Sequence, residues 1–165
     1  MKIAIISDIH DQIDNLNWTL NQIKNKDISY IFTLGDYTSS YVIERLQVDT
    51  IPIYAVWGNC DGDKQSMLQV SNNKNPYISF ANKPFYEVEI DTKRIFITHY
   101  PELAENAAKT LDYDAVFHGH THYKRNEKIG NISIINPGKL AIYPDNEISF
   151  AIFDTQNSNV EFIIK

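Results

Sequence analysis

The amino-acid sequence predicts an α/β fold that combines parallel and antiparallel strands. Five short apolar runs typical of buried strands are spread along the chain, and an amphipathic segment separates the first two, as in a parallel strand-helix-strand unit. In the second half of the chain, strand-like segments are joined by short turns, which favours antiparallel hairpins. Since the chain shows no repeat, low-complexity tract or long linker, we expect a single domain over residues 1–165.

The parallel unit lies at the start of the chain. The runs KIAIIS, from residue 2, and YIFTLG, from residue 30, are apolar enough to be buried strands. The segment between them is predicted to be a helix with Asp11 as its N-cap and four apolar side chains on one face: Ile13, Leu16, Leu20 and Ile23. A second helix is predicted over residues 40–46.

The later elements alternate less regularly. IYAVWG, RIFIT and AVFHG complete the set of five buried strands. A third helix begins at Pro101, because proline suits the first helical position and small or apolar residues follow at helical spacing: Leu103, Ala104, Ala107, Ala108 and Leu111. FYEVEID and KRIFITH flank a turn at Asp91 and Thr92, KIGNISII contains the hairpin signal Gly-Asn, and EISFAIFD pairs with NVEFIIK at the C-terminus.

Composition narrows the class of protein. A net charge of -6 and a pI near 5.3 give little attraction for a polyphosphate backbone, so we expect no stable binding of nucleic acids. No apolar run approaches the roughly 20 residues of a membrane span, and the N-terminus lacks a secretory apolar region. The single cysteine, Cys60, fits a reducing compartment. We therefore expect a cytoplasmic protein with no membrane association, and exposed hairpin strands that could pair in a homodimer.

All five buried strands run into a side chain that can bind a metal or a hydrogen-bond partner: Asp8, Asp36, Asn59, His99 and His120. In α/β sheets, ligands bind outside the carboxyl ends of the strands. His10 and His122 lie two residues beyond members of this set. Each of the seven could alone be a cap, a turn former or a structural histidine. Together they would crowd oxygen and nitrogen donors at one edge, which requires a compensating charge.

The donor types indicate which cations the site would bind. Imidazole and carboxylate without thiolate favour Mn, Fe, Co, Ni or Zn over Mg or Ca, and we expect manganese first. Seven donors exceed one tetrahedral shell, so we predict two divalent metal ions with a shared ligand. Two-metal sites serve in-line displacement at phosphorus, because they activate a water molecule and stabilise the developing charge. The sequence therefore predicts the hydrolysis of phosphate esters.

Five motifs occur in a characteristic order: DIH at 8–10, GD at 35–36, GNCD at 58–61, TH at 98–99 and GHTH at 119–122. This series resembles the calcineurin-like metallophosphoesterase superfamily, and most of all its small prokaryotic phosphodiesterases of the YfcE type. The resemblance implies a four-layer αββα sandwich and a metal-bridging hydroxide as nucleophile. It places Asp8, His10 and His122 on one metal and Asn59, His99 and His120 on the other. Asp36 bridges the two, and Asp36, Asn59 and His99 are expected to be catalytic.

Two positions depart from patterns found in the superfamily. Tyr100 follows His99 where a glycine is usual, and its ring could narrow the cleft or contact the substrate. Cys60 follows Asn59 where the phosphoprotein phosphatases have a histidine that protonates the leaving group. A cysteine at this position resembles the residue found in the small phosphodiesterase branch. The leaving-group acid is therefore missing or supplied by a metal-bound water.

Further side chains are candidates for substrate contact. Tyr37, Tyr100 and Tyr123 each adjoin a predicted ligand, and with Cys60 they form our predicted substrate-binding set; with ten tyrosines in the chain, chance adjacency is the alternative. Lys124 and Arg125 could hold a phosphate oxygen or lie on a solvated strand edge. The loop NPGK at 136–139 is expected to shape the site, and His118 to be structural.

Three functions are compatible with these residues. The first is a metal-dependent phosphodiesterase acting on small or nucleotide-type phosphate esters. The second is a phosphomonoesterase with the same site. The third is a non-catalytic scaffold, as in the retromer coat subunit that shares this fold without a full active site. A scaffold has no need of a complete histidine set, which favours an enzyme here: His10, His99, His120 and His122.

Overall fold

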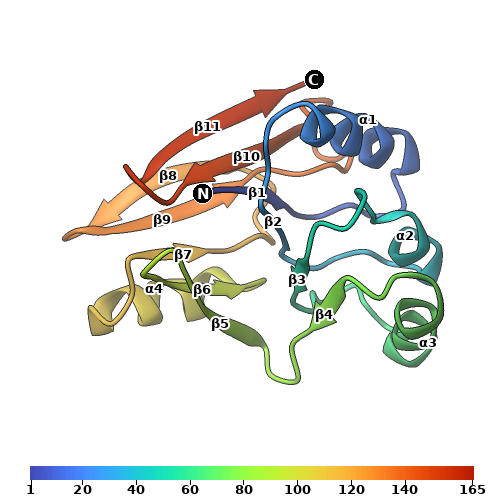
Figure 1. The fold of residues 1–165 in the computed structure, drawn as a ribbon, viewed down its shortest axis with the longest axis horizontal. Helices are drawn as coiled ribbons and strands as arrows, with labels where there is room; N and C mark the ends of the chain where they lie inside the picture. The colour runs from blue at the N-terminus through green and yellow to red at the C-terminus, as the bar shows by residue number, and fades with distance from the viewer.

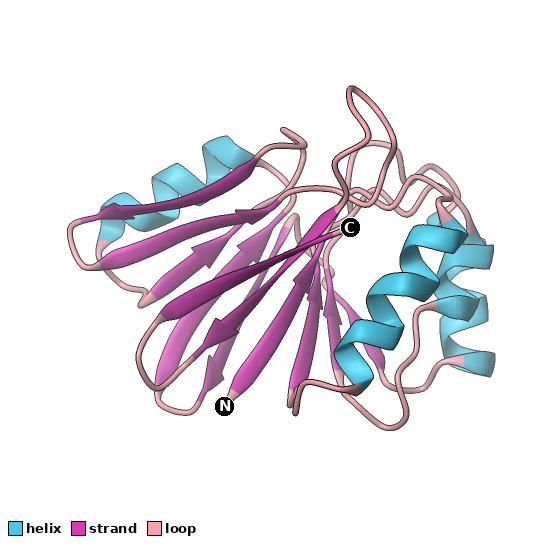
Figure 2. Ribbon diagram, turned by 90° about the horizontal axis from the view of Figure 1, so that it is seen from above, coloured by secondary structure: helices cyan, strands magenta, loops and turns pink.

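The computed structural model describes all residues 1–165 as two mixed sheets with helices on their outer faces. The strand order is β11-β10-β1-β2-β3-β4 in the six-stranded sheet and β5-β6-β7-β9-β8 in the five-stranded sheet. Seen from above, helices lie on the outer side of each sheet and none lies between the sheets (Figure 2). This confirms the predicted α/β class and the four-layer αββα sandwich.

The six-stranded sheet has a parallel half and an antiparallel half. Its strands are β1 (Lys2–Ile6), β2 (Tyr30–Thr33), β3 (Ile53–Ala55), β4 (Ile78–Phe80), β10 (Ser149–Asp154) and β11 (Asn159–Ile164). Strands β1 to β4 pair in parallel, whereas β10 pairs antiparallel with both β1 and β11. The predicted parallel unit and the predicted C-terminal pair are both confirmed.

The five-stranded sheet is built around two hairpins. Its strands are β5 (Phe85–Ile90), β6 (Lys93–Thr98), β7 (Ala115–Phe117), β8 (Lys124–Ile129) and β9 (Ile132–Pro137). Asp91 and Thr92 join β5 to β6 with φ of 53° and 65°, and a left-handed pair matches the twist of a two-residue hairpin. β7 lies between β6 and β9 and is parallel to both. Both predicted hairpins are present.

Four helices cover the sheets (Figure 1). α1 (Ile13–Lys24), α2 (Ser40–Arg45) and α3 (Lys64–Lys74) lie beside the six-stranded sheet, and α4 (Pro101–Thr110) packs on β6, β7 and β9. The prediction that Asp11 caps α1 is wrong: the N-cap is Gln12, and the Asp11 carboxylate accepts a hydrogen bond from Ser39. None of the helices combines the length and the apolar character needed to cross a bilayer.

Three apolar clusters correspond to the three contacts between layers. The largest has 21 buried residues between the six-stranded sheet and its helices, the second has 14 between the sheets, and the third has 7 under α4. Burying a large apolar side chain contributes about 1.5 to 3 kcal/mol, so these clusters hold the strands firmly. The loops at the carboxyl ends of the parallel strands are thereby fixed on a rigid base.

Candidate metal centre

The structure brings all seven predicted donors together at one edge of the two sheets. Loops after β1, β2 and β3 of one sheet meet loops after β6 and β7 of the other. The contacts cross between the sheets: the backbone N–H of His120 donates to Asp8 over 3.0 Å, and Nε2 of His99 lies 2.9 Å from Oδ1 of Asn59. The prediction from the strand ends therefore agrees with the geometry.

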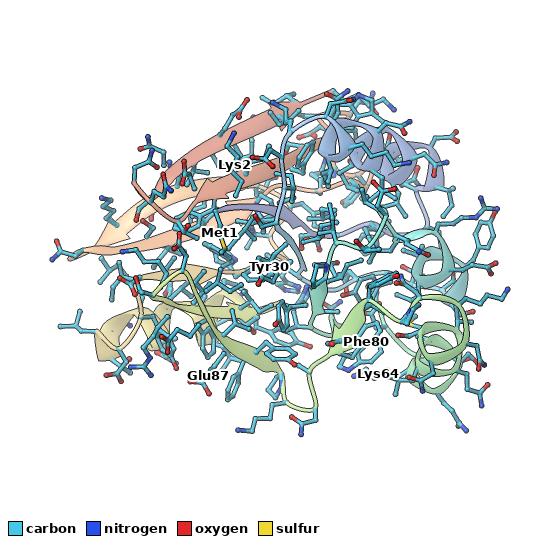
Figure 3. The ribbon with its side chains drawn as sticks, viewed as in Figure 1. Met1, Lys2, Tyr30, Lys64, Phe80 and Glu87 are labelled. Atoms are coloured by element: carbon cyan, nitrogen blue, oxygen red, sulfur yellow. The ribbon has the colours of Figure 1, made fainter.

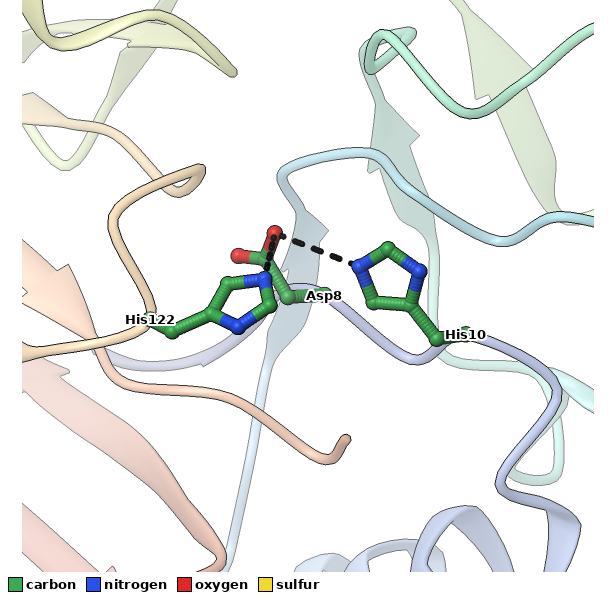
Figure 4. Close-up of side chains that lie close together, drawn as sticks. All are labelled: Asp8, His10 and His122. Carbon is green, nitrogen blue, oxygen red and sulfur yellow. Dashed lines mark ion pairs between the residues drawn. The ribbon is translucent and has the colours of Figure 1, made fainter. Parts of the chain in front are cut away.

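The first group of donors consists of Asp8, His10 and His122, which we call site one (Figure 4). Oδ1 of Asp8 lies 3.3 Å from Nε2 of His122 and 3.9 Å from Nε2 of His10. The other carboxylate oxygen of Asp8 accepts hydrogen bonds from Ser7 and from the His120 backbone. One carboxylate oxygen is thus held by the protein, and the other faces the two imidazoles.

The second group consists of Asn59, His99 and His120, which we call site two. Oδ1 of Asn59 lies 2.8 Å from Nδ1 of His120 and 2.9 Å from Nε2 of His99. The two ring nitrogens are themselves 3.2 Å apart. His99 is fully buried, whereas Asn59 and His120 are exposed, so site two is open to solvent on one side.

Asp36 lies between the two sites. Its Oδ2 is 3.4 Å from Nε2 of His10, a site one residue, and 3.5 Å from Nε2 of His99, a site two residue. Its Oδ1 accepts a hydrogen bond of 2.8 Å from the Cys60 backbone, which fixes the carboxylate. A single carboxylate oxygen therefore faces the imidazoles of both groups.

The unpaired atoms of the two sites fit divalent cations. Oδ1 of Asp8 and Nε2 of His10 are buried and have no hydrogen-bond partner. Nδ1 of His99 lies 2.7 Å from the Leu34 carbonyl and Nδ1 of His122 lies 3.0 Å from the Tyr143 carbonyl. Because Nδ1 must donate in each case, the neutral ring presents the lone pair of Nε2 to the site. A donor set of imidazole nitrogens with carboxylate and amide oxygens suits borderline transition metals.

Asp8 and His122 shift each other's pKa. Burial alone would raise the pKa of Asp8, but the neighbouring His122 and His99 imidazoles and the Ser7 hydroxyl hold that pKa below its ordinary value. The Asp8 carboxylate, 3.3 Å away, in turn raises the pKa of His122 above its ordinary 6.5. A proton on His122 therefore competes with a metal for the same lone pair.

The donors are carried on strained backbone. Five of the seven have left-handed φ values between 44° and 70°: Asp8, His10, Asp36, His120 and His122. This conformation costs a non-glycine residue roughly 1 kcal/mol or more, and such strain concentrates at functional sites. Glycines allow the loops to approach closely, because a Cβ at Gly58 would overlap Oδ1 of Asp36 and one at Gly119 would overlap the Ser7 hydroxyl.

Asp61 supports this arrangement, although sequence reasoning assigned it no role. Its buried carboxylate accepts four backbone hydrogen bonds, of 3.0, 2.7, 3.1 and 2.7 Å, from Asp36, Tyr37, Thr38 and Gly58. The loop that carries the central carboxylate is thereby tied to the loop that carries Asn59. The only sequence signal is its place at the end of GNCD, which does not reveal the amides that it binds.

The loop that begins at residue 136 supports site one through hydrogen bonds, which agrees with the prediction that NPGK shapes the site. The Asn136 side chain donates to the Gly119 carbonyl over 2.9 Å, and the backbone N–H of Ala141 donates to the Asp8 carbonyl over 2.9 Å. Lys139 is 1% exposed and donates to the Asp145 carboxylate and to two backbone carbonyls. These contacts hold the loop whose Tyr143 carbonyl orients His122.

The three tyrosines predicted to bind substrate lie in different surroundings. Tyr37 as a substrate contact is wrong: its ring is fully buried and its hydroxyl donates to the carbonyl oxygens of Thr33 and Val56, so it belongs to the core. The ring of Tyr100 packs 5.1 Å from that of His99 and 6.0 Å from that of His120, centroid to centroid. Tyr123 is 62% exposed, and its predicted contact stays a prediction.

Cys60 lies at the cleft as an exposed thiol. Its Sγ lies near His10 and Asp36 and belongs to a third group of side chains that could hold a metal. Partial burial and the charge of the nearby Asp36 carboxylate raise the pKa of the thiol to about 11. Because the thiolate is the reactive form, this environment does not favour a cysteine nucleophile.

The remaining basic and imidazole side chains are engaged elsewhere. Lys124 pairs with Glu147 at 2.8 Å, and Arg125 pairs with Glu105 and Glu127 at 3.2 and 2.9 Å. These pairs match the alternative of a solvated strand edge. His118 is buried, and its Nδ1 contacts the Gly119 carbonyl, away from both sites.

Comparison with known proteins agrees with this geometry. Residues 1–158 match the calcineurin-like phosphoesterase superfamily domain. The chain is 31% identical to Phosphodiesterase MJ0936 of Methanocaldococcus jannaschii over 99% of both chains. It is 28% identical to Phosphodiesterase YfcE of Escherichia coli over 93% of this chain and 88% of that protein. A solved structure described as a novel archaeal phosphodiesterase matches with a TM-score of 0.89 at 30% identity and covers 100% of both chains.

These similarities identify the protein as a phosphoesterase. The chain belongs to the calcineurin-like phosphoesterase superfamily, as the order of its five motifs predicted. Membership in this superfamily implies divalent metal ions, and the gathered carboxylates and imidazoles fit them.

Proposed function

We propose that the protein is a phosphodiesterase that hydrolyses phosphate diesters at two divalent metal ions, with manganese the first candidate. Site one and site two would each hold one ion, and Asp36 would bridge them. The observation that carries this proposal is the position of Oδ2 of Asp36 within 3.5 Å of imidazoles from both groups. Two such ions would activate a water molecule as nucleophile and stabilise the charge that develops on the phosphate.

The side chains of the protein prepare the site for this reaction. The Leu34 and Tyr143 carbonyls keep His99 and His122 in the tautomer that offers Nε2. The Cys60 backbone N–H holds one oxygen of Asp36 and leaves the other free. Asn59 and His120 are exposed and form the open side, where a phosphate group would enter. We assign catalytic roles to Asp36, Asn59 and His99 on this basis.

Two cavities beside the donors favour a diester over a monoester. One of about 210 Å³ is lined by His10 and His122 of site one together with Ile142 and Tyr143. The other, of about 500 Å³, is lined in part by Trp57 and Tyr100 on the side of site two. A diester has two substituents on phosphorus, and each cavity can accept one of them. The absence of a histidine at position 60 also favours esters whose leaving group needs little protonation, such as nitrophenolate, over esters that leave as an alkoxide.

The test compares metal dependence and substrate class in one assay. Chelator-treated protein, resupplied with Mn²⁺, Ni²⁺ or Co²⁺, is offered bis(p-nitrophenyl) phosphate and the monoester with the same leaving group, p-nitrophenyl phosphate. We expect activity to return with metal and kcat/KM to be higher for the diester. A clear monoester preference would support the phosphomonoesterase instead, and no turnover of either ester with any ion would support a scaffold.

The bridging assignment is tested with Asp36→Asn, and Asp11→Asn serves as its matched control. Both aspartates have a left-handed φ of 57°, which asparagine tolerates, but Asp11 pairs only with Ser39. We expect Asp36→Asn to lose metal and turnover and Asp11→Asn to keep both. If Asp36→Asn retained two metals and near-normal turnover, Asp36 would not be the bridge.

A further inference from the structure

The 500 Å³ cavity beside site two combines aromatic rings with two lysines. Its walls come from the loop before Asn59, the start of α3 and the segment after β4: Trp57, Lys64, Leu68, Phe80, Ala81, Asn82, Lys83, Pro84 and Tyr100. We call it the Trp57 cavity. Tyr100 connects it to the metal centre, because the same ring packs against His99 and His120. A group bound there would lie next to a phosphate at site two.

An aromatic pair forms one wall of this cavity. The rings of Trp57 and Phe80 are stacked at 4.1 Å with an angle of 8°. The buried ring of Tyr37 packs edge-on against both, and the indole N–H donates to the Ala81 carbonyl over 3.2 Å. The wall is therefore held rigid before any ligand binds, which lowers the entropic cost of binding a flat apolar group.

Two lysines give the Trp57 cavity a positive charge. Nζ of Lys64 lies 5.4 Å from the centroid of the Trp57 ring. Lys83 lines both this cavity and the neighbouring one, and its Nζ lies 5.2 Å from the ring centroid of Phe85, which lines only the neighbouring cavity. Lys64 and Phe80 lie close together at this corner of the molecule (Figure 3). Neither lysine makes an ion pair, whereas Lys74 at the other end of α3 is paired with Glu44. No carboxylate lines the cavity in a protein whose net charge is -6.

The cavity on the other side of the metal centre has neither a stacked aromatic pair nor a lysine. It is lined by His10, Gln12, His122, Ala141, Ile142 and Tyr143, with no lysine or arginine. The two substituents of a diester would therefore meet different surroundings. Of the two cavities, only the Trp57 cavity has cations beside an aromatic wall. This combination suits a substituent in which an aromatic ring is joined to an anionic group.

We propose that the Trp57 cavity binds the substituent of the diester that carries an aromatic ring and a second anionic group, of the kind found in a nucleoside monophosphate. Lys64 and Lys83 contact the second anion, and Trp57 and Phe80 contact the ring. This proposal rests on the proposed diesterase function, but binding in the cavity needs no turnover and is measured separately.

The binding test uses the two tryptophans of the chain. Trp18 lies on α1, where it packs against Phe150, so Trp18→Phe leaves Trp57 as the only indole reporter. We expect thymidine monophosphate to change the Trp57 fluorescence of the metal-free protein, and to bind about tenfold more tightly than thymidine. The double variant Lys64→Gln and Lys83→Gln should reduce this preference to about one. Equal affinity for the two ligands in the Trp18→Phe protein, or no fluorescence response, would overturn the proposal.

The kinetic test separates this proposal from the proposed function. We expect kcat/KM for a thymidine dinucleotide with a terminal phosphate to exceed that for the unphosphorylated dinucleotide about tenfold, and the lysine double variant to lose this excess. Lys74→Gln, on the same helix but outside the cavity, should behave as the parent with both dinucleotides. If the parent protein hydrolysed no diester, the proposed function would be refuted. If it hydrolysed diesters but had the same kcat/KM for both dinucleotides, only the role of the Trp57 cavity would be refuted.

Discussion

Replacing Asp61 by asparagine tests whether one buried carboxylate holds the metal-binding loops together. Its two oxygens accept two backbone hydrogen bonds each, and the partners belong to residues 36–38 and to Gly58. Asparagine has nearly the same shape but only one accepting oxygen, so its amide NH₂ would face two N–H donors. Hydrogen bonds to a charged group contribute about 1.5 to 3 kcal/mol each, so losing two costs about 3 to 6 kcal/mol. This is a large part of a total stability of about 5 to 15 kcal/mol.

The assay is urea unfolding of the metal-free protein, with Asp63→Asn as the control. Asp63 caps α3 and accepts one backbone hydrogen bond, from Ser66, and asparagine caps helices about equally well. We expect Asp63→Asn to leave the free energy of unfolding almost unchanged. If Asp61→Asn were no more destabilising than this control, the four hydrogen bonds would not support the site as argued.

Three further predictions concern the site. Cys60→Ser should retain both metals and diesterase activity within roughly tenfold, or about 1.4 kcal/mol of barrier; abolished turnover with metal content intact would show that the thiol does chemistry. Asp8 raises the pKa of His122 above 6.5, so protons occupy the imidazole at lower pH and Mn²⁺ affinity should fall as the pH is lowered from 8 to 6. Calorimetric titration measures this, and an affinity independent of pH would contradict it. Lys139→Met should destabilise the protein by about 1 to 3 kcal/mol, because it leaves the carbonyls that Lys139 binds without a donor. Lys124→Met, which removes a surface ion pair, should cost at most about 1 kcal/mol in the same thermal unfolding experiment.

The donor set could be predicted because its signal is local in the sequence. Each apolar run predicts a strand, and the polar residue after it predicts a position at the strand's carboxyl end. Parallel pairing of β1, β2 and β3, and of β6 and β7, then brings these residues to one edge. Hairpins were predictable for a similar reason, since turns such as Gly130-Asn131 are encoded by the residues within them.

Other features depend on contacts that no local pattern contains. α3 was not predicted because only Met67 and Ser71 of its eleven residues are buried, which leaves almost no apolar periodicity. Tyr37 follows Asp36 in the sequence, but the left-handed backbone at Asp36 turns the next ring into the core. The role of Asp61 depends on amides contributed by a loop some 25 residues away.

A metal titration shows whether the site works with two ions or with one. Metal-free protein is titrated with the ion that gives the highest turnover, and hydrolysis of bis(p-nitrophenyl) phosphate is measured at each addition. Because Asp36 faces both donor groups, we expect turnover to reach its maximum at two equivalents of metal per chain. A maximum at one equivalent, or full turnover in protein shown to be metal-free by elemental analysis, would contradict it.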